Sequence, residues 1–380
     1  MKVLISGYYG FGNFGDELIL TMLIQQLKNW GLKNSDITVL SIDPQTTGED
    51  NDVNCINSHN MKLIMERLPN FDVMISGGGS LLQNTTSIAS LMYYCGLITT
   101  FTSMKKNVAI YAQGIGPIKG LFGTWLTKST LKRCKYISVR DEKSQNLLKK
   151  WKIDSDLVCD PVLGLELPAR KKTNKIGIQI RKFDTLTDKL IDDIIVELFK
   201  RYGDREYELI SFQDIEDEEI SKIVISKMKM HNKDVRVNLV SGLSVPQIIK
   251  QVGTYDTFIA MRYHACMLGI KYGIKTMAIN YDPKVEILAN AANIPCLQMK
   301  SKDNNYEKAF DALDALTPFN LLNWANSQKF DWDKTHIHEL INPELAKEEE
   351  SKNDKKNDKK KDKKKKDKGL EEIVIEETLD

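Results

Sequence analysis

The sequence has few of the features that mark a secreted, metal-binding or membrane-spanning protein. Its six cysteines are scattered singly over 380 residues, with no C-x-x-C pair, no H-E-x-x-H motif and no Cys/His cluster. This excludes a disulfide framework and a zinc site of the usual spacing, so we expect reduced thiols and no metal. No uncharged apolar run reaches the roughly 18 residues of a membrane span. The apolar stretch behind Met1 is too short for a signal sequence, and we therefore expect a cytoplasmic protein.

A large excess of charge of one sign is also absent. The chain has 54 basic and 52 acidic residues, a net charge of +2, and much of its basic character lies in one C-terminal segment. This balance gives no support to nucleic-acid binding. The 42% content of hydrophobic residues is that of a globular protein, and the chain is long enough for two domains.

Short apolar runs alternate with stretches of helical periodicity through most of the chain. Examples are KVLISG followed by ELILTMLIQQLKNW, and DVMISGGG followed by SIASLMYYCGLITTFTS. This alternation predicts α/β structure with a parallel sheet flanked by helices. A basic, proline-containing stretch, ELPARKKTNK, interrupts the pattern. We expect a first domain at residues 1–167, a linker at 168–174, a second domain at 175–300, a helical segment at 301–345 and a disordered, lysine-rich tail at 346–380.

Glycine is concentrated at three strand ends in the first half of the chain. The first of these turns, GYYGFGNFGDE, has neither the G-K-S/T of a Walker A loop nor the spacing of the dinucleotide fingerprint, so we infer neither ATP nor NAD. Ligands of doubly wound sheets bind at the carboxyl ends of strands, where these turns would meet. We expect a hydroxyl-rich substrate to contact this region through Gly12, Asn13, Gly15, Gly78, Gly79 and Gln113.

Asp16 begins the helix after the first glycine turn and admits two interpretations. Its carboxylate can accept a hydrogen bond from a sugar hydroxyl or remove the hydroxyl proton. An acidic residue at this place also stabilises a helix by capping it. The two interpretations are nearly balanced, and Asp16 stays a candidate base.

Basic residues gather at strand ends in the second half of the chain. Arg262 and His264 follow the apolar run DTFIA and are separated by one residue, so on an extended segment their side chains would point to one side. Lys284 follows the next apolar run, twenty residues after His264. Arginine suits carboxylate and phosphate groups, and histidine can hold a proton near neutral pH. Each residue alone would fit a surface ion pair or a structural histidine. Together with Arg140 and Arg181, they predict a pocket for a small, multiply charged anion between the domains.

Seven blocks of the sequence resemble, in order, those of the polysaccharide pyruvyl transferase family, most closely its CsaB type. They are GYYGFGNFGDE, SGGGSLLQ, AQGIGP, SVRDEKS, DPVL, MRYHA and YDPKVE, and the resemblance extends over about residues 1–300. It implies a GT-B-like fold in which two Rossmann-like domains face a cleft, with the acceptor on the N-terminal side and phosphoenolpyruvate (PEP) on the C-terminal side. It also implies transfer of pyruvyl from PEP to a sugar as a ketal, with release of phosphate.

The resemblance also implies which residues act on the substrates. It places the PEP contacts on Arg262, His264 and Lys284, with Arg140 as a further match, and the position of Arg181 at a strand end adds this residue to the set. PEP would be a co-substrate, and no cofactor is expected. We interpret His264 as the general acid and Asp16 as the base that activates the acceptor.

For the CsaB type, the resemblance implies a specific acceptor. The sugar would be N-acetylmannosamine in a lipid-linked precursor of a secondary cell-wall polymer, whose ketal serves S-layer anchoring. Such an acceptor would bring the enzyme into peripheral contact with the inner leaflet of the membrane. The segment from Lys347 to Lys368 carries twelve lysines against seven acids, which could attract it weakly to that surface or merely solvate it. The number of subunits stays open.

Two other functions stay open on the sequence alone. The first is a GT-B glycosyltransferase that uses a nucleotide sugar, in which an acidic residue such as Glu286 would bind the donor ribose. The second is a carbohydrate-binding protein without catalytic activity, which would leave the grouping of arginine, histidine and lysine unexplained.

Overall fold

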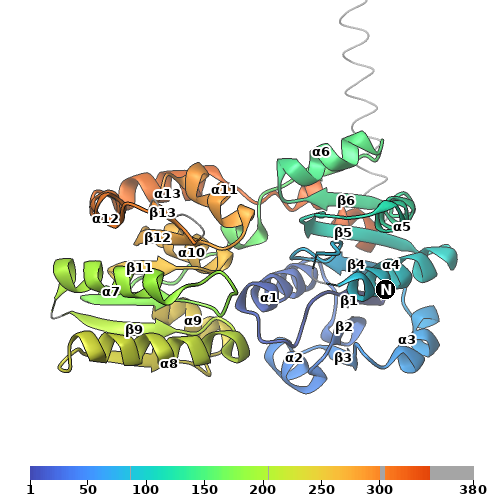
Figure 1. Ribbon diagram of the computed structural model, residues 1–380. Coiled ribbons are helices and arrows are strands. Elements are labelled where there is room, and N and C mark those ends of the chain that lie inside the picture. The colour runs from blue at the N-terminus through green and yellow to red at the C-terminus, as the bar shows by residue number, and fades with distance from the viewer. Residues whose placement is uncertain (86, 204, 300–303, 343–380) are drawn as a thin grey trace, which may run out of the picture. The chain divides into compact units, whose positions relative to one another are not determined.

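The computed structural model describes residues 1–85, 87–203, 205–299 and 304–342 (Figure 1). Residues 1–335 form one compact unit, and a second unit begins at His336, where helix α14 (Ile337–Ile341) is described. The predicted tail at 346–380 lies outside the described residues. Within the described ranges, no helix is both long enough and apolar enough to cross a membrane.

A seven-stranded parallel sheet is built from the first half of the chain, with the strand order β3-β2-β1-β4-β5-β6-β7. Its central strands are short runs of buried residues, as expected where helices cover both faces of a parallel sheet. The strands are β1 (Val3–Ser6), β2 (Ile37–Ser41), β3 (Asn54–Asn57), β4 (Val73–Gly77), β5 (Asn107–Gln113), β6 (Tyr136–Val139) and β7 (Asp156–Leu157).

Helices follow the strands of this sheet in regular alternation. Apolar residues of α3, α4, α5 and α6 pack together with the strands in one hydrophobic cluster. The α-helices are α1 (Phe14–Asn29), α2 (Pro44–Asn51), α3 (Met61–Arg67), α4 (Ile88–Ser103), α5 (Leu121–Leu131) and α6 (Glu142–Lys150). Short 3-10 helices are η1 (Asn34–Asp36), η2 (Leu68–Asn70) and η3 (Pro161–Gly164).

A six-stranded parallel sheet follows, with the order β10-β9-β8-β11-β12-β13. Its strands are β8 (Lys175–Gln179), β9 (Glu206–Ile210), β10 (Val237–Val240), β11 (Thr257–Ala260), β12 (Lys275–Asn280) and β13 (Cys296–Gln298). The helices between them are α7 (Asp188–Tyr202), α8 (Asp214–His231), α9 (Val245–Val252), α10 (Tyr263–Lys271) and α11 (Pro283–Ala292). The predicted α/β fold with two parallel sheets is confirmed.

The segment after the second sheet contacts both sheets. Phe310 and Leu313 of α12 (Tyr306–Asp314) belong to the hydrophobic core of the second sheet. Helix α13 (Pro318–Ser327) packs against α10 and α11. The chain then returns to the first sheet, where Trp332, just before η4 (Asp333–Thr335), stacks on Tyr111 of β5 with 5.5 Å between ring centroids.

Candidate functional site

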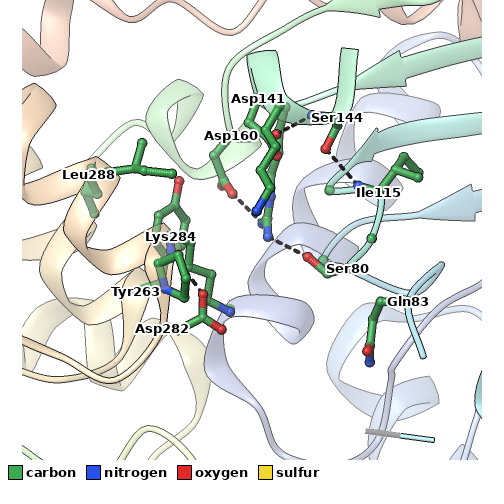
Figure 2. Close-up of a pocket in the computed structure, with 18 of the residues that line it drawn as sticks. Ser80, Gln83, Ile115, Asp141, Ser144, Asp160, Tyr263, Asp282, Lys284 and Leu288 are labelled. Carbon is green, nitrogen blue, oxygen red and sulfur yellow. Dashed lines mark hydrogen bonds and ion pairs between the residues drawn. The ribbon is translucent and has the colours of Figure 1, made fainter. Parts of the chain in front are cut away.

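A cavity of about 1920 Å³ is lined by the turns at the carboxyl ends of both sheets. It receives residues that follow β1, β4, β5 and β6 of the first sheet and β8, β11 and β12 of the second. Figure 2 shows Ser80, Asp160, Tyr263 and Lys284 around it. A site for one small molecule usually has about 300–1,000 Å³. The cavity is therefore large enough for two substrates.

The strand order of each sheet explains why the cavity lies here. The first sheet reverses its order between β1 and β4, and the second reverses between β8 and β11. Loops on the two sides of such a reversal diverge to opposite faces of the sheet and leave a crevice at the strand ends. The glycine turns follow β1 and β4, and Arg181 and Arg262 follow β8 and β11.

The first glycine turn is joined to the second half of the chain by two hydrogen bonds and an aromatic contact. The N–H of Phe14 donates a hydrogen bond to the carbonyl of Phe212 at 2.9 Å, and the side-chain amide of Gln213 donates to the carbonyl of Phe11 at 3.2 Å. The rings of Phe14 and Phe212 meet edge to face, with 4.6 Å between centroids. These contacts bring the start of α1 against residues that follow β9.

Gly15 lies directly against His264 as a result. A Cβ atom at Gly15 would stand 1.7 Å from Nδ1 of the imidazole, so only glycine permits this approach. Asn13 is the N-cap of α1, because its side-chain oxygen accepts a hydrogen bond from the N–H of Gly15 at 3.1 Å. The cap is thus Asn13, and the capping interpretation of Asp16 does not hold.

Asp16 faces the cavity from the first turn of α1. Its carboxylate lies against Gly79, where a Cβ atom would be 2.5 Å from Oδ1, and Gly79 has a φ of +65°. Burial raises the pKa of Asp16, while the charges of His264, Lys284 and Arg140 act in the opposite direction. A partly buried carboxylate with a raised pKa is suited to accept a proton.

Three of the predicted acceptor contacts lie elsewhere. Gly12 and Gly78 are not among the residues that line the cavity, and Gly78 instead packs against Ile19 of α1. Gln113 is fully buried, and its amide donates to the carbonyl and the hydroxyl of Ser76 at 2.8 and 2.9 Å. Gln113 therefore joins β5 to β4, because its side chain extends between the strands and not toward the edge of the sheet. Asn13, Gly15 and Gly79 do line the cavity.

His264 lies at the start of α10 and pairs with Asp160, which precedes η3. Its Nε2 is 3.5 Å from Oδ2 of Asp160, an ion-pair contact longer than a normal hydrogen bond. The other oxygen of Asp160 accepts the N–H of Val162 at 3.1 Å. Burial acts to raise the pKa of Asp160, but His264 and Arg140 outweigh it, and the pKa is lowered. Asp160 thus stays ionised beside the imidazole.

Arg140 completes this cluster from the end of β6. Its Nη1 is 2.8 Å from Oδ2 of Asp160, and its Nη2 donates to the hydroxyl of Ser80 at 3.0 Å. The guanidinium also lies 5.4 Å from the ring centroid of Tyr263. Arg140 is therefore oriented by fixed partners on one side and faces the cavity on the other.

The remaining predicted cations differ in how far they are already paired. The Nε–H of Arg262 donates hydrogen bonds to Oδ1 and Oδ2 of the buried Asp217, at 3.0 and 2.9 Å. Nη2 of Arg262 is 2.6 Å from Oδ1 of the same carboxylate. Arg181 is paired more loosely, with Nη2 3.3 Å from Glu216, and its guanidinium lies 5.3 Å from the ring of Tyr281. Both arginines line the cavity, but Arg262 is also a buried brace of the second sheet.

Lys284 has no carboxylate partner within the described ranges of the chain. Its Nζ lies 6.0 Å from the ring centroids of both Tyr263 and Tyr281. Its backbone N–H donates to Asp282, the N-cap of α11, at 3.0 Å. Lys284 thus presents an unneutralised charge to the cavity beside two aromatic rings.

Asp160, Ser80 and Tyr263 belong to this site but received no role from the sequence alone. Asp160 opens the DPVL block, and Ser80 follows the GGG turn, so a polar residue at a strand end was the available signal. That signal does not distinguish a capping residue from a partner of His264. The described part of the chain contains no group of three or more His, Cys, Asp or Glu residues placed to hold a metal ion.

Solved structures with a similar fold are nucleotide-sugar enzymes and related proteins. UDP-GlcNAc 2-epimerase from Neisseria meningitidis, bound to UDP-GlcNAc, aligns with a TM-score of 0.59 and 12% identity over 91% of this chain and 100% of its own. HepE from Anabaena, in complex with UDP and glucose, aligns with a TM-score of 0.56 and 11% identity over 91% and 100%. A glycosyltransferase from Rickettsia africae aligns with a TM-score of 0.55 and 15% identity over 90% of this chain and 98% of its own. At this identity the likeness shows the fold alone, which is GT-B-like as the resemblance implied.

The sequence comparisons are more specific about the family. A search of curated proteins found no match. A family model described as polysaccharide pyruvyl transferase matches residues 13–283. This match runs from the N-cap of α1 to the first residue of α11 and so includes most of the strand ends around the cavity. Because it covers well over half of the sequence, the chain belongs to the polysaccharide pyruvyl transferase family.

Proposed function

We propose that this protein transfers the pyruvyl group of PEP to two hydroxyls of a sugar, forming a ketal and releasing phosphate. The observation that carries the proposal is the unpaired charge of Lys284 beside Arg140 and His264. Arg140 and Lys284 lie 5.4 and 6.0 Å from the ring centroid of Tyr263, and Arg140 and His264 both contact Asp160. The three are therefore close enough together to share one small anion. PEP has a carboxylate and a phosphate on three carbons, and binding it requires several cations.

The chemistry assigns different tasks to the two sides of the cavity. Protonation of C3 of PEP makes C2 electrophilic, and His264 is the candidate donor. A sugar hydroxyl then attacks C2 while Asp16 accepts its proton, and phosphate leaves with the electron pair of the C2–O bond. The second hydroxyl adds to C2, gives its proton to the departing phosphate and closes the ketal ring. Asp160 positions the imidazole for its proton transfer to C3 through the contact between Nε2 and Oδ2.

Arg140, Lys284 and Arg181 are the candidate ligands of PEP. Arg140 is oriented by Asp160 and Ser80, so its guanidinium loses little freedom when it binds a carboxylate or phosphate. Arg262 is proposed to act mainly by holding the turn that carries His264, because Asp217 already occupies its fork.

For the acceptor, we propose the CsaB type: N-acetylmannosamine of a lipid-linked precursor of a secondary cell-wall polymer. The resemblance of the sequence blocks supports this choice. The volume of the cavity, which exceeds what PEP alone would need, is consistent with it. Such an acceptor would place the enzyme in the cytoplasm, in peripheral contact with the inner leaflet of the membrane.

A nucleotide-sugar glycosyltransferase receives less support from the site. Its donor ribose would need an acidic partner in the cavity, and Glu286 was the candidate. Glu286 instead accepts a hydrogen bond from Gln298 at 3.3 Å and does not line the cavity. If the protein only bound carbohydrate, the pairing of His264 with Asp160 in the cavity would have no explanation.

Ligand-dependent thermal unfolding and phosphate release test the proposal together. PEP should raise the unfolding temperature at concentrations where UDP-sugars do not, because Glu286, the candidate partner of a donor ribose, does not line the cavity. The variant His264→Ala should still bind PEP, and its phosphate release in the presence of acceptor should fall about 10²–10⁴-fold. Stabilisation by UDP-sugars alone, or wild-type turnover in the variant, would contradict the proposal.

A further inference from the structure

Large apolar side chains are exposed at the N-terminal ends of α4 and α5. Leu121 and Trp125 of α5 are 92% and 64% exposed, and Phe122 lies between them with its ring centroid 6.3 Å from that of Trp125. Ile88 and Met92 of α4 are also exposed. These five residues, with Lys119, Lys128 and Lys132, are called the rim patch below.

The two helices run side by side in the same direction, which brings these residues to one end. A Cβ atom at Gly123 of α5 would lie 3.6 Å from Leu91 of α4, near the start of both helices. The hydroxyls of Thr99 and Thr130 are 3.3 Å apart near their ends. The buried face of α5 thus points to α4, and its apolar outer face is left in solvent.

The segment of the chain that contains the rim patch has charge of one sign only. From Val73 to Arg140 the sequence contains no Asp or Glu and eight Lys or Arg. One stripe along α5 and the residue just after it combines apolar and basic side chains. It contains Leu121, Trp125, Lys128 and Lys132, which follow one another at intervals of four, three and four positions. The lysines of the rim patch have no carboxylate partner in the described ranges.

The rim patch lies next to the opening of the cavity. The cavity is lined in part by Ser90 of α4 and Thr124 of α5. Ser90 is two positions from the exposed Met92, and Thr124 is next to the exposed Trp125. Helix N-termini follow the carboxyl ends of the strands, which is where the cavity lies. A surface that contacts the rim patch would therefore stand close to the cavity.

We propose that the rim patch is a docking surface for an anionic phospholipid membrane. Helices that lie in a bilayer interface typically expose Trp, Phe and Leu beside lysines. The rim patch has this composition, and its segment contains no acidic residue. A second copy of the chain fits less well, because a two-fold contact would place the lysines of one patch against those of the other. Docking would bring a lipid-linked sugar to the cavity, and this consequence alone rests on the proposed function.

The test measures co-sedimentation of the full-length protein with vesicles of phosphatidylglycerol and phosphatidylcholine, and with vesicles of phosphatidylcholine alone. The triple variant Leu121→Ser, Phe122→Ser, Trp125→Ser should bind the anionic vesicles at least about tenfold more weakly than the wild type. The matched control removes three exposed apolar residues of the acid-rich helix α8, Ile215→Ser, Ile223→Ser and Met230→Ser, and should bind like the wild type.

A second set separates charge from apolar contact. The variant Lys119→Gln, Lys128→Gln, Lys132→Gln should lose affinity for anionic vesicles, and the three corresponding changes to arginine should preserve it. All variants keep the C-terminal tail, so its contribution is common to them. Equal binding of the triple-serine variant and the wild type would overturn the proposal. So would equal binding to both vesicle types, or a dimer in sedimentation velocity that the triple-serine variant loses.

Phosphate release from PEP with a water-soluble acceptor tells this proposal apart from the proposed function. The rim patch variants should keep this activity, because none of the substituted residues lines the cavity. Absence of activity in the wild type would refute the transfer reaction and leave the vesicle result standing. Retained activity with unchanged vesicle binding would refute membrane docking alone.

Discussion

The turns of the two sheets line one cavity with different chemistry. Those of the first sheet contribute backbone, glycine and the carboxylates of Asp16 and Asp160, whereas those of the second contribute His264, Lys284 and Arg181. Glycine turns allow a close approach, and cationic turns supply attraction for an anion. The comparison teaches that equivalent positions in two similar folds can be specialised separately, one for shape and one for charge.

The division is not complete, because each side positions a residue of the other. Asp160 of the first half pairs with His264 of the second, and Gly15 leaves the space that the imidazole occupies. Arg140, a cation, also belongs to the first half. The catalytic group that we propose therefore depends on both sheets.

The largest effect is expected from Gly15→Ala, which would break the contact between the two sides. The added methyl would stand 1.7 Å from Nδ1 of His264, so the imidazole must move away from its place. The rate of phosphate release should fall about 10²–10⁴-fold, as for a lost proton donor. Gly96→Ala in α4 is the control, because nothing lies within 4 Å of that position. A turnover near that of the wild type would show that this position of His264 is not required.

A second comparison separates two cations of the second sheet. Arg262→Ala would leave Asp217 buried without its partner and should lower the free energy of unfolding by about 3–5 kcal/mol. Arg262→Lys should not restore it, because the fork is lost. Lys284→Ala should leave the unfolding free energy nearly unchanged and raise KM for PEP about tenfold or more.

Denaturant unfolding and KM measurements on the same preparations check this contrast. If Arg262→Ala folds with wild-type stability but loses PEP binding, its guanidinium serves the substrate and not the fold. If both variants weaken PEP and acceptor equally, the two residues belong to a shared scaffold.

Asp160→Asn tests the pairing of His264 across the cavity. The variant loses the carboxylate charge that faces both His264 and Arg140, which should lower the rate of phosphate release about 10–100-fold. Because the pKa of Asp160 is lowered, its carboxylate stays ionised throughout the neutral range and keeps a negative charge 3.5 Å from Nε2 of His264. A carboxamide has no such charge, so the pH–rate profile should change together with the rate.

The pH–rate profile is the decisive readout for this variant. Asp43→Asn serves as the control, because Asp43 caps α2 and does not line the cavity. A reduced rate with an unchanged profile would mean that Asp160 acts only by holding Arg140 or the chain.

The smallest effect distinguishes two neighbouring acids of the glycine turn. Burial raises the pKa of Glu17 from 4.5 to about 7, although the N–H of Gly10 donates to it. A carboxyl group whose pKa is raised by folding stabilises the protein most below about pH 4.5, and this contribution is lost as the pH rises through 7.

Glu17→Gln should therefore increase the free energy of unfolding by about 1 kcal/mol at about pH 8 and have little effect at about pH 4. Catalysis should be nearly unaffected, because Glu17 does not line the cavity. Asp16→Asn should do the reverse, slowing turnover with little change in stability. Denaturant unfolding at a series of pH values gives the answer, and parallel curves for wild type and Glu17→Gln would contradict it.

The predictable part of the fold follows from local patterns. Alternation of apolar runs and helical stretches indicated two parallel sheets, and both are present with their strands at those runs. The rule that ligands bind at strand ends brought Asp16, His264 and Lys284 to one edge, and all three line the cavity. The same rule failed for Gln113, which does not line the cavity. A residue that ends a strand can also extend its side chain between strands, as Gln113 does toward Ser76.

The sequence by itself determined which residues stand at the strand ends, because strand and helix periodicity depend on neighbours within a few positions. Only the tertiary structure decided how these residues pair. It joined Arg262 to Asp217 and placed Asp160 beside His264. It gave Lys284 no carboxylate partner within the described ranges. Such pairings arise between segments distant in the chain, whose approach depends on the packing of whole helices and sheets. Gly15 shows this most clearly, because a side chain at this position would collide with the imidazole of His264, which belongs to helix α10 in the second half of the chain.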